Sequence, residues 1–165
     1  MEHMLIPVAR VPVIKEAISE LRKRTNCKIS MEDGNSIAID GEPYDEYNAK
    51  NILQAMARGF KLSAALKLLT ENYFFESIDI GDIAPNKEKL KRIKARVIGT
   101  DGKAKLYMES VSGAAIEISG DTISIIGNIE EIRVAKAGIN ILLDGGKHNT
   151  AYMVMEKERR KLKDE

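Results

Sequence analysis

The feature that most constrains the fold of this chain is an internal repeat. Residues 25–30 align with residues 112–117 at an offset of 87. Beyond these segments, after a difference of one residue in a predicted hairpin, Gly41 aligns with Gly127. Each copy of a repeat has to form its own supersecondary unit, so a repeat of roughly 85 residues predicts two small units of the same design.

Hydrophobic spacing predicts the same order of elements in both copies: strand, helix, helix, strand, strand, helix. In the first copy we predict strands at 4–8, 27–31 and 36–40 and helices at 13–24 and 44–58, followed by a short helix at 62–69 with Ser63 as its N-cap. In the second copy we predict strands at 74–80, 115–119 and 122–126 and helices at 86–97, about 102–111 and 129–143. The predicted fold class is α+β, with a three-stranded antiparallel sheet in each unit covered on one face by helices.

Composition excludes several kinds of site. The chain has one cysteine, Cys27, and two distant histidines, His3 and His148, so it offers no disulfide framework and no zinc-binding spacing. It also has no P-loop and no paired-carboxylate motif. We therefore predict no metal, no cofactor and no catalytic residue, which argues against an enzyme. No apolar run approaches the length of a membrane span, so we expect no membrane partner and a cytoplasmic location.

The basic residues are concentrated in one stretch. The formal net charge is only +1, but eight Lys or Arg residues and two acidic residues fall between Lys87 and Lys105. A local basic stripe favours binding of a polyanion such as a nucleic acid. The alternative is an ordinary solvated helix face.

A tetrapeptide inside this basic stretch, Gly99-Thr100-Asp101-Gly102, separates two predicted helices. Because glycine has no Cβ atom, it adopts unusual dihedral angles and lets another backbone approach closely. Amides at the start of the next helix can then face a phosphate group. The pattern predicts a turn that binds a phosphodiester backbone, and an ordinary helix–helix turn is the alternative.

This arrangement resembles the KH domain. The motif Ile98-Gly99-x-x-Gly102 lies between the first two helices of the predicted unit, as in eukaryotic-type (type I) KH domains, which bind RNA and single-stranded DNA. The chain also resembles a narrower family, the two-KH small-subunit ribosome assembly factors of archaea and eukaryotes (Pno/Dim type, related to Krr). The segments that carry this resemblance are 58–69, 123–127, 142–148, Tyr152 and 156–163.

The resemblance implies a noncatalytic protein that holds single-stranded small-subunit rRNA near its 3′ end during ribosome assembly and pre-rRNA processing. Members of the family are linked to the endonuclease that trims this end, to the rRNA dimethyltransferase and, in archaea, to the alpha subunit of initiation factor two. The resemblance also implies two tandem type I KH domains. The implied divisions are a degenerate KH domain at 1–60, a helical connector at 61–73, a KH domain at 74–147 and a charged C-terminal helix at 148–165.

KH loops clamp about four nucleotides while the bases lie across an apolar groove. By resemblance, the floor of this groove would be Ile98, Met108 or a neighbour, Ile116 and Ile118, and basic side chains would supply the electrostatic part. The implied RNA-binding residues are Arg92, Lys94, Arg96, Ile98, Gly99, Thr100, Asp101, Gly102, Lys103, Lys105, Ile116 and Ile118. Asp101 adds a negative charge on the phosphate path, and water and salt would screen it at an exposed loop tip.

The first copy departs from the KH pattern. Residues 12–15, Pro-Val-Ile-Lys, align with the glycine loop, so the first unit has no such loop and is expected to form one helix there. A second hypothesis follows, in which the protein is an interaction scaffold and RNA binding is secondary. Val11, Val13 and Ile14 would then serve packing or a partner surface. His148 could contact RNA or a partner, or simply close the start of a helix.

Overall fold

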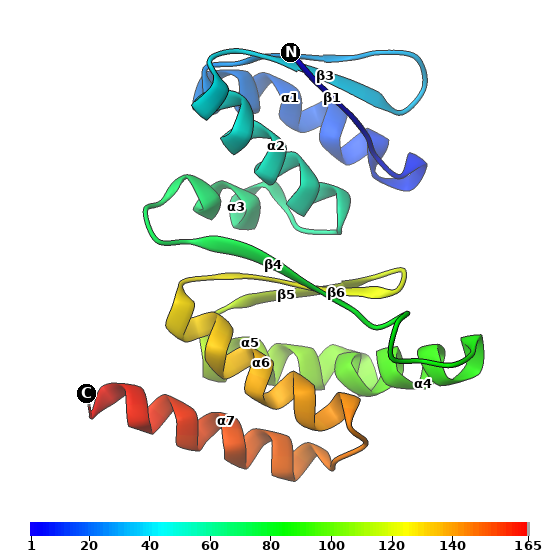
Figure 1. Ribbon diagram of the computed structural model, residues 1–165, viewed down its shortest axis with the longest axis vertical. Helices are drawn as coiled ribbons and strands as arrows, with labels where there is room; N and C mark the ends of the chain where they lie inside the picture. The colour runs from blue at the N-terminus through cyan, green and yellow to red at the C-terminus, as the bar shows by residue number, and fades with distance from the viewer. Residues whose placement is uncertain (165) are drawn as a thin grey trace. The chain divides into compact units, whose positions relative to one another are not determined.

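The computed structural model describes residues 1–164, and the chain forms two compact units (Figure 1). Unit 1 comprises Met1–Glu71, and unit 2 begins at Asn72. Each unit contains one three-stranded antiparallel sheet together with helices. The predicted α+β class with two such sheets is therefore confirmed.

Unit 1 is built on strands β1 (Glu2–Leu5), β2 (Lys28–Met31) and β3 (Ser36–Asp40), which pair in the order β1-β3-β2. Helices α1 (Val11–Thr25) and α2 (Pro43–Ala57) contact each other and lie on one face of this sheet (Figure 1). Two short elements, helix α3 (Leu62–Ala65) and the 3-10 turn η2 (Leu66–Leu69), follow and contact α2. The sheet is thus covered by two long helices.

Helix α1 forms without a break, as predicted for a copy that lacks the glycine loop. A 3-10 turn, η1 (Val8–Arg10), precedes it, and Pro12 lies in its first turn, where a proline does not interrupt the helix. Asn26 ends α1 in the left-handed conformation with φ 57° and ψ 33°, which asparagine tolerates better than most residues.

Two local predictions for unit 1 are wrong. The first strand ends at Leu5 instead of residue 8, because the chain turns at Pro7, whose carbonyl accepts a hydrogen bond from the N–H of Arg10. Ser63 is not an N-cap. It lies inside α3, and the capping residue is Lys61, whose carbonyl accepts the N–H groups of the first turn.

Unit 2 repeats the sheet with strands β4 (Phe74–Asp79), β5 (Ala115–Ser119) and β6 (Thr122–Gly127) in the order β4-β6-β5. Its helices are α4 (Lys87–Ile98), α5 (Lys103–Ser112), α6 (Ile129–Leu143) and α7 (His148–Lys163). The 3-10 turn η3 (Thr100–Gly102) joins α4 to α5. Because β6 is central, β5 is an edge strand with one side free of sheet pairing.

Asparagine residues fix the starts of two helices in unit 2. The side chain of Asn86 accepts the N–H of Lys89 at 2.8 Å at the start of α4. Asn128 and Glu131 form a reciprocal capping box at the start of α6. These caps explain why both helices begin where the sequence predicts.

Helix α7 completes the core of unit 2. Ala151 and Met155 are fully buried, and α7 packs along α6 (Figure 1). The two helices approach closely at Gly138, where an added Cβ would lie only 2.2 Å from the sulfur of Met155. The apolar side of α7 is therefore part of the unit. Four of its charged residues, Lys157, Arg160, Lys161 and Lys163, are exposed, while Glu156 and Arg159 hydrogen-bond to α5.

Candidate nucleic-acid interface

The loop between α4 and α5 contains three residues with positive φ. They are Gly99 (φ 77°, ψ 172°), Asp101 (φ 56°) and Gly102 (φ 76°). The dihedral pair of Gly99 lies in a region that is essentially restricted to glycine. Helix α4 therefore ends at this residue, whose N–H donates to the carbonyl of Ala95 at 2.8 Å.

The two glycines are needed for different reasons. A Cβ on Gly99 would lie 2.6 Å from both the backbone nitrogen and the Cβ of Ala104, so this glycine lets α4 and α5 approach closely. A Cβ on Gly102 would meet nothing within 4 Å, so only its left-handed conformation favours glycine. Gly102 is also the N-cap of α5 and leaves the start of that helix without a side-chain cap.

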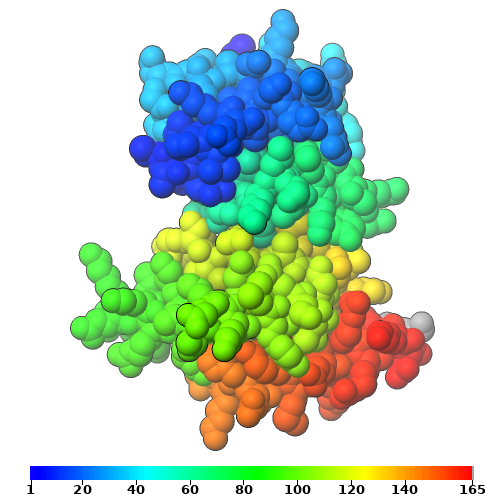
Figure 2. Space-filling model, turned by 180° about the vertical axis from the view of Figure 1, so that it is seen from behind, coloured from blue at the N-terminus to red at the C-terminus, as the bar shows by residue number. Residues whose placement is uncertain are grey.

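The tip of the loop and part of the basic stretch are exposed. Thr100, Asp101 and Lys103 are exposed, as is Arg92, while Lys94 is half-buried. Figure 2 shows the α4 segment, in green, at the surface of the molecule. Three of the predicted cations, Arg92, Lys94 and Lys103, therefore lie where a polyanion can reach them.

The guanidinium of Arg96 is hydrogen-bonded to backbone carbonyl groups within unit 2. It donates to the carbonyl of Leu142 at 3.4 Å and also to the carbonyl of Gly146. The carbonyl of Arg96 lies 2.8 Å from Nε2 of His148, the first residue of α7. These contacts join the end of α4 to the turn between α6 and α7. Arg96 thus anchors the helix that leads into the loop.

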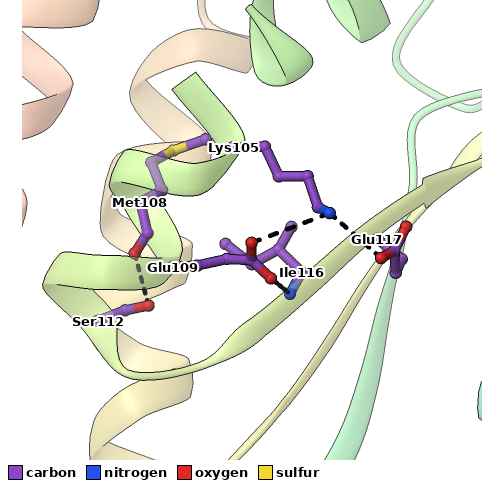
Figure 3. A network of polar contacts seen from close by, with 6 residues as sticks. All are labelled: Lys105, Met108, Glu109, Ser112, Ile116 and Glu117. Carbon is purple, nitrogen blue, oxygen red and sulfur yellow. Dashed lines mark hydrogen bonds and ion pairs between the residues drawn. The ribbon is translucent and has the colours of Figure 1, made fainter. Parts of the chain in front are cut away.

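Lys105 is also paired, on the side of α5 that faces the edge strand (Figure 3). Its Nζ lies 3.2 Å from Oε1 of Glu117 on β5 and 3.9 Å from Oε1 of Glu109, one helical turn further along α5. The second carboxylate oxygen of Glu109 accepts the backbone N–H of Ile116 at 2.9 Å. The surface between α5 and β5 therefore carries a charged cluster that includes two carboxylates.

The predicted apolar floor needs a correction. Ile116 and Met108 have no exposed surface and belong to the core of unit 2, because α5 packs over this part of the sheet. A side chain at 0% exposure cannot touch a base, so Ile116 supports the strand from beneath. Ile98 and Ile118 are half-buried, and they are the two predicted apolar residues that present a surface.

Within residues 1–164, no group of three or more His, Cys, Asp or Glu side chains is arranged to hold a metal ion. No helix in this part of the chain has the length and apolar character needed to cross a membrane.

Residues 74–160 match the family model of the second KH domain of PNO1 proteins, described as a eukaryotic type KH-domain (KH-domain type I). A KH domain-containing protein of Methanocaldococcus jannaschii is 34% identical over 98% of this chain and 75% of its own length. The chain belongs to the Pno/Dim family of KH proteins. The recognised KH domain thus contains the glycine loop, the basic helix and most of α7.

Other relatives of this KH protein differ in how much of their length it covers. The RNA-binding protein PNO1 of Oryzias latipes is 30% identical over 63% of the chain, which spans only 44% of that relative. Dim2p from Pyrococcus horikoshii is 31% identical, with a TM-score of 0.85 over 94% of this chain and 98% of that structure. A chain in the crystal structure of an a/eIF2alpha-aDim2p-rRNA complex from the same organism is 30% identical, with a TM-score of 0.87 over 97% and 94%.

Two acidic residues of the KH domain, Glu109 and Glu117, were not among the residues predicted from the sequence. The spacing of Lys105 and Glu109, four residues apart on one helix, is a signal for the first pair. No sequence signal indicates Glu117, because that contact forms between a helix and an edge strand. The contact between the carbonyl of Arg96 and the ring of His148 likewise appears only in the folded chain.

Proposed function

We propose that this protein holds single-stranded small-subunit rRNA near its 3′ end during ribosome assembly and pre-rRNA processing, without catalysing a reaction. The observation that carries the proposal is the exposed turn at Gly99–Gly102, shaped by glycines at the end of a basic helix. Two comparisons support it. Relatives are named as pre-rRNA-processing proteins, and a chain 30% identical to this one comes from a complex that contains rRNA.

In this proposal the RNA backbone passes over the loop. Gly99 and Gly102 let the phosphate groups approach the protein backbone, and the partial positive charge at the start of α5 attracts them. Arg92, Lys94 and Lys103 add the electrostatic attraction that dominates affinity for nucleic acids. The bases then lie beside Ile98 and Ile118. Asp101 weakens the attraction only slightly, because an exposed charge is screened by salt.

We extend the proposal to unit 1, so that the chain holds two tandem type I KH domains. Both sheets have the same strand order. Thr25 Oγ1 donates to the carbonyl of Leu21 at 2.6 Å, and Ser112 Oγ donates to that of Met108 at 2.7 Å at the same offset of 87 residues. In this proposal residues 1–60 are a KH domain without the loop, 61–73 a connector, 74–147 the RNA-clamping domain and 148–165 the charged C-terminal helix.

The proposed partners follow from the same relatives. The rRNA 3′ region is one, and the alpha subunit of initiation factor two is another, because the P. horikoshii complex contains both rRNA and a/eIF2alpha. We also propose the rRNA-trimming endonuclease and the rRNA dimethyltransferase as partners that meet the protein at this end of the rRNA. All of these contacts would take place in the cytoplasm.

The proposal is tested with a charge placed at the loop tip. Thr100 is exposed and its φ is not positive, so Thr100→Asp introduces no backbone strain. We expect its affinity for a single-stranded oligonucleotide of the rRNA 3′ end to fall about threefold at low salt, where a second carboxylate at the loop tip is screened least. Ser110→Asp is the matched control, with the same charge change on the exposed face of α5. Equal affinities of Thr100→Asp and the unmodified protein would refute the groove assignment.

The presence of a/eIF2alpha in the P. horikoshii complex also favours the second candidate function, a protein-interaction scaffold. Unit 1 is suited to this role because it has no glycine loop for RNA. Affinity purification of the tagged protein after nuclease treatment separates the two functions. A scaffold retains its protein partners after the RNA is destroyed, whereas loss of every partner with the RNA would leave only the RNA-binding function.

A further inference from the structure

The outer edge of strand β5 is partly covered by a side chain of its own unit. β5 pairs only with β6, so the N–H groups that point away from β6 have no partner in the sheet. The N–H of Ile116 is one of them, and it donates to Oε2 of Glu109 at 2.9 Å. A base lying along this edge would therefore meet the carboxylate of Glu109 before it met the backbone of Ile116.

The position of Glu109 is fixed, but its carboxylate is still accessible. Oε2 is held by the N–H of Ile116, and Oε1 lies 3.9 Å from Nζ of Lys105 (Figure 3). The side chain of Glu109 remains 24% exposed. A carboxylate has about four acceptor sites, so two neighbours leave acceptor capacity for a ligand.

The charges around Glu109 do not cancel. Lys105 is shared between Glu109 and Glu117, so the cluster of one cation and two carboxylates carries a net negative charge. The exposed residues Arg92 and Lys103, on the helices that flank the loop, are basic. A phosphate is repelled from the cluster, whereas a neutral group that donates hydrogen bonds is attracted to it. The cluster is thus suited to the base of a nucleotide whose phosphate lies on the loop.

We propose that Glu109 selects the base that lies against β5, and that it favours bases with an exocyclic amino group over uracil. The amino group of cytosine, adenine or guanine can donate to the free acceptor sites of the carboxylate. Uracil presents a carbonyl oxygen where cytosine presents its amino group, and this oxygen is repelled by Glu109. The inference rests on the proposed function, because it assigns a base preference to the proposed RNA groove.

Cytosine and uracil give the cleanest test, since the two bases have the same size and differ in the groups that face the carboxylate. Fluorescence anisotropy would compare all-cytidine and all-uridine RNA oligonucleotides of equal length at one salt concentration. We expect the unmodified protein to bind oligocytidine on the order of tenfold more tightly than oligouridine, as for a hydrogen bond to a charged group. The ratio of the two affinities is the quantity that reports on Glu109.

The deciding variant is Glu109→Gln. Its amide oxygen can still accept the N–H of Ile116, and its NH₂ group then points toward the base as a donor, which suits the carbonyl of uracil. We expect the preference for oligocytidine to fall to about threefold or less, or to reverse. Glu117→Gln is the matched control, because it removes the other partner of Lys105 without touching Ile116, and it should keep the original ratio.

The outcomes separate this inference from the proposed function. If the unmodified protein binds neither oligonucleotide nor the rRNA 3′-end sequence, the proposed function fails and the base preference fails with it. If the protein binds RNA but Glu109→Gln keeps the preference of the unmodified protein, only the role of Glu109 is overturned. The same holds if the unmodified protein does not distinguish the two oligonucleotides, or if Glu117→Gln changes the ratio as much as Glu109→Gln does.

Discussion

The edge strands of the two units are held by equivalent residues of opposite charge. In unit 1, Nε of Arg22 donates to the carbonyl of Ile29 at 2.8 Å. In unit 2, the aligned Glu109 accepts the N–H of the aligned Ile116 at 2.9 Å. A side chain from the preceding helix thus reaches the same edge residue in both units, with the direction of the hydrogen bond reversed. The fold conserves coverage of the edge between its two copies, while the charge at that edge differs.

A second contact is the same in both units. In each, one arginine donates to two carbonyl groups at the end of the helix that follows the sheet. The sets are Arg10 with Met56 and Phe60, and Arg96 with Leu142 and Gly146. The segment from Arg96 to Glu109 in unit 2 is one residue longer than the segment from Arg10 to Arg22 in unit 1. Unit 2 is the copy that contains the glycine loop. Unit 2 therefore accommodates the glycine loop with one extra residue, within a framework of arginine contacts that both units share.

The largest effect is expected where the units differ most, at the loop. Gly99→Ala combines a dihedral pair restricted to glycine with a Cβ only 2.6 Å from the backbone of Ala104. We expect it to lower the free energy of unfolding by about 3 kcal/mol. Gly102→Ala, at an open position with positive φ, should cost about 1 kcal/mol. Chemical denaturation followed by circular dichroism measures both, and equal losses would contradict the separate roles of the two glycines.

The hydrogen bonds of Arg10 in unit 1 and of Arg96 in unit 2 should contribute similar amounts to the free energy of unfolding of their units. Arg10→Ala and Arg96→Ala each remove the guanidinium hydrogen bonds to two carbonyl groups, so we expect each to lower the stability of its own unit by about 2 kcal/mol. Peptide-resolved hydrogen exchange assigns the loss to the correct unit. Arg92→Ala is the control, because this arginine is exposed. It should reduce RNA affinity and leave stability nearly unchanged.

The reversed hydrogen bond at the edge predicts a smaller, local effect. In Glu109→Ala the N–H of Ile116 loses its acceptor, and we expect this amide to exchange on the order of tenfold faster in hydrogen-exchange NMR. Arg22→Ala should leave the amide of Ile29 unchanged, because Arg22 binds the carbonyl of that residue. If both amides accelerated equally, the two contacts would be equivalent after all.

The smallest effect is expected at Cys27, which aligns with Ala114. Both residues are 4% exposed, so an alanine already fits the equivalent position in unit 2. We expect Cys27→Ala to cost about 1 kcal/mol or less in a thermal unfolding experiment. Burial raises the pKa of the Cys27 thiol, so the unmodified protein should react slowly with iodoacetamide at neutral pH. Rapid alkylation of the folded protein would show that this site opens in unit 1.

The periodic parts of the fold could be predicted from the sequence. Helix α6 has the predicted bounds, Ile129–Leu143, because apolar spacing and an asparagine cap agree at its start. The left-handed helix ends at Asn26 and Gly113 have an equally local cause, since these residue types favour that conformation. Local chemistry decides such features, and local chemistry is what a sequence displays directly.

The candidate site was less predictable, because its surface depends on contacts between elements. Alternation along β5 indicates that Ile116 and Ile118 share a face, but it does not indicate that α5 covers the first and leaves the second half-exposed. Charge alone likewise suggested that Arg96 and Lys105 serve RNA. Whether a basic side chain forms a hydrogen bond or ion pair within its own unit depends on distances between elements of the fold.

The place of α7 in the core has a consequence for synthesis on the ribosome. Unit 1 ends at Glu71, so its whole sequence leaves the exit tunnel while unit 2 is still being translated. Unit 2 cannot bury Gly138 against Met155 until α7 has emerged as well. The proposed RNA-binding surface of unit 2 is therefore completed late in translation, and the nascent chain presents a finished first unit before the second has folded.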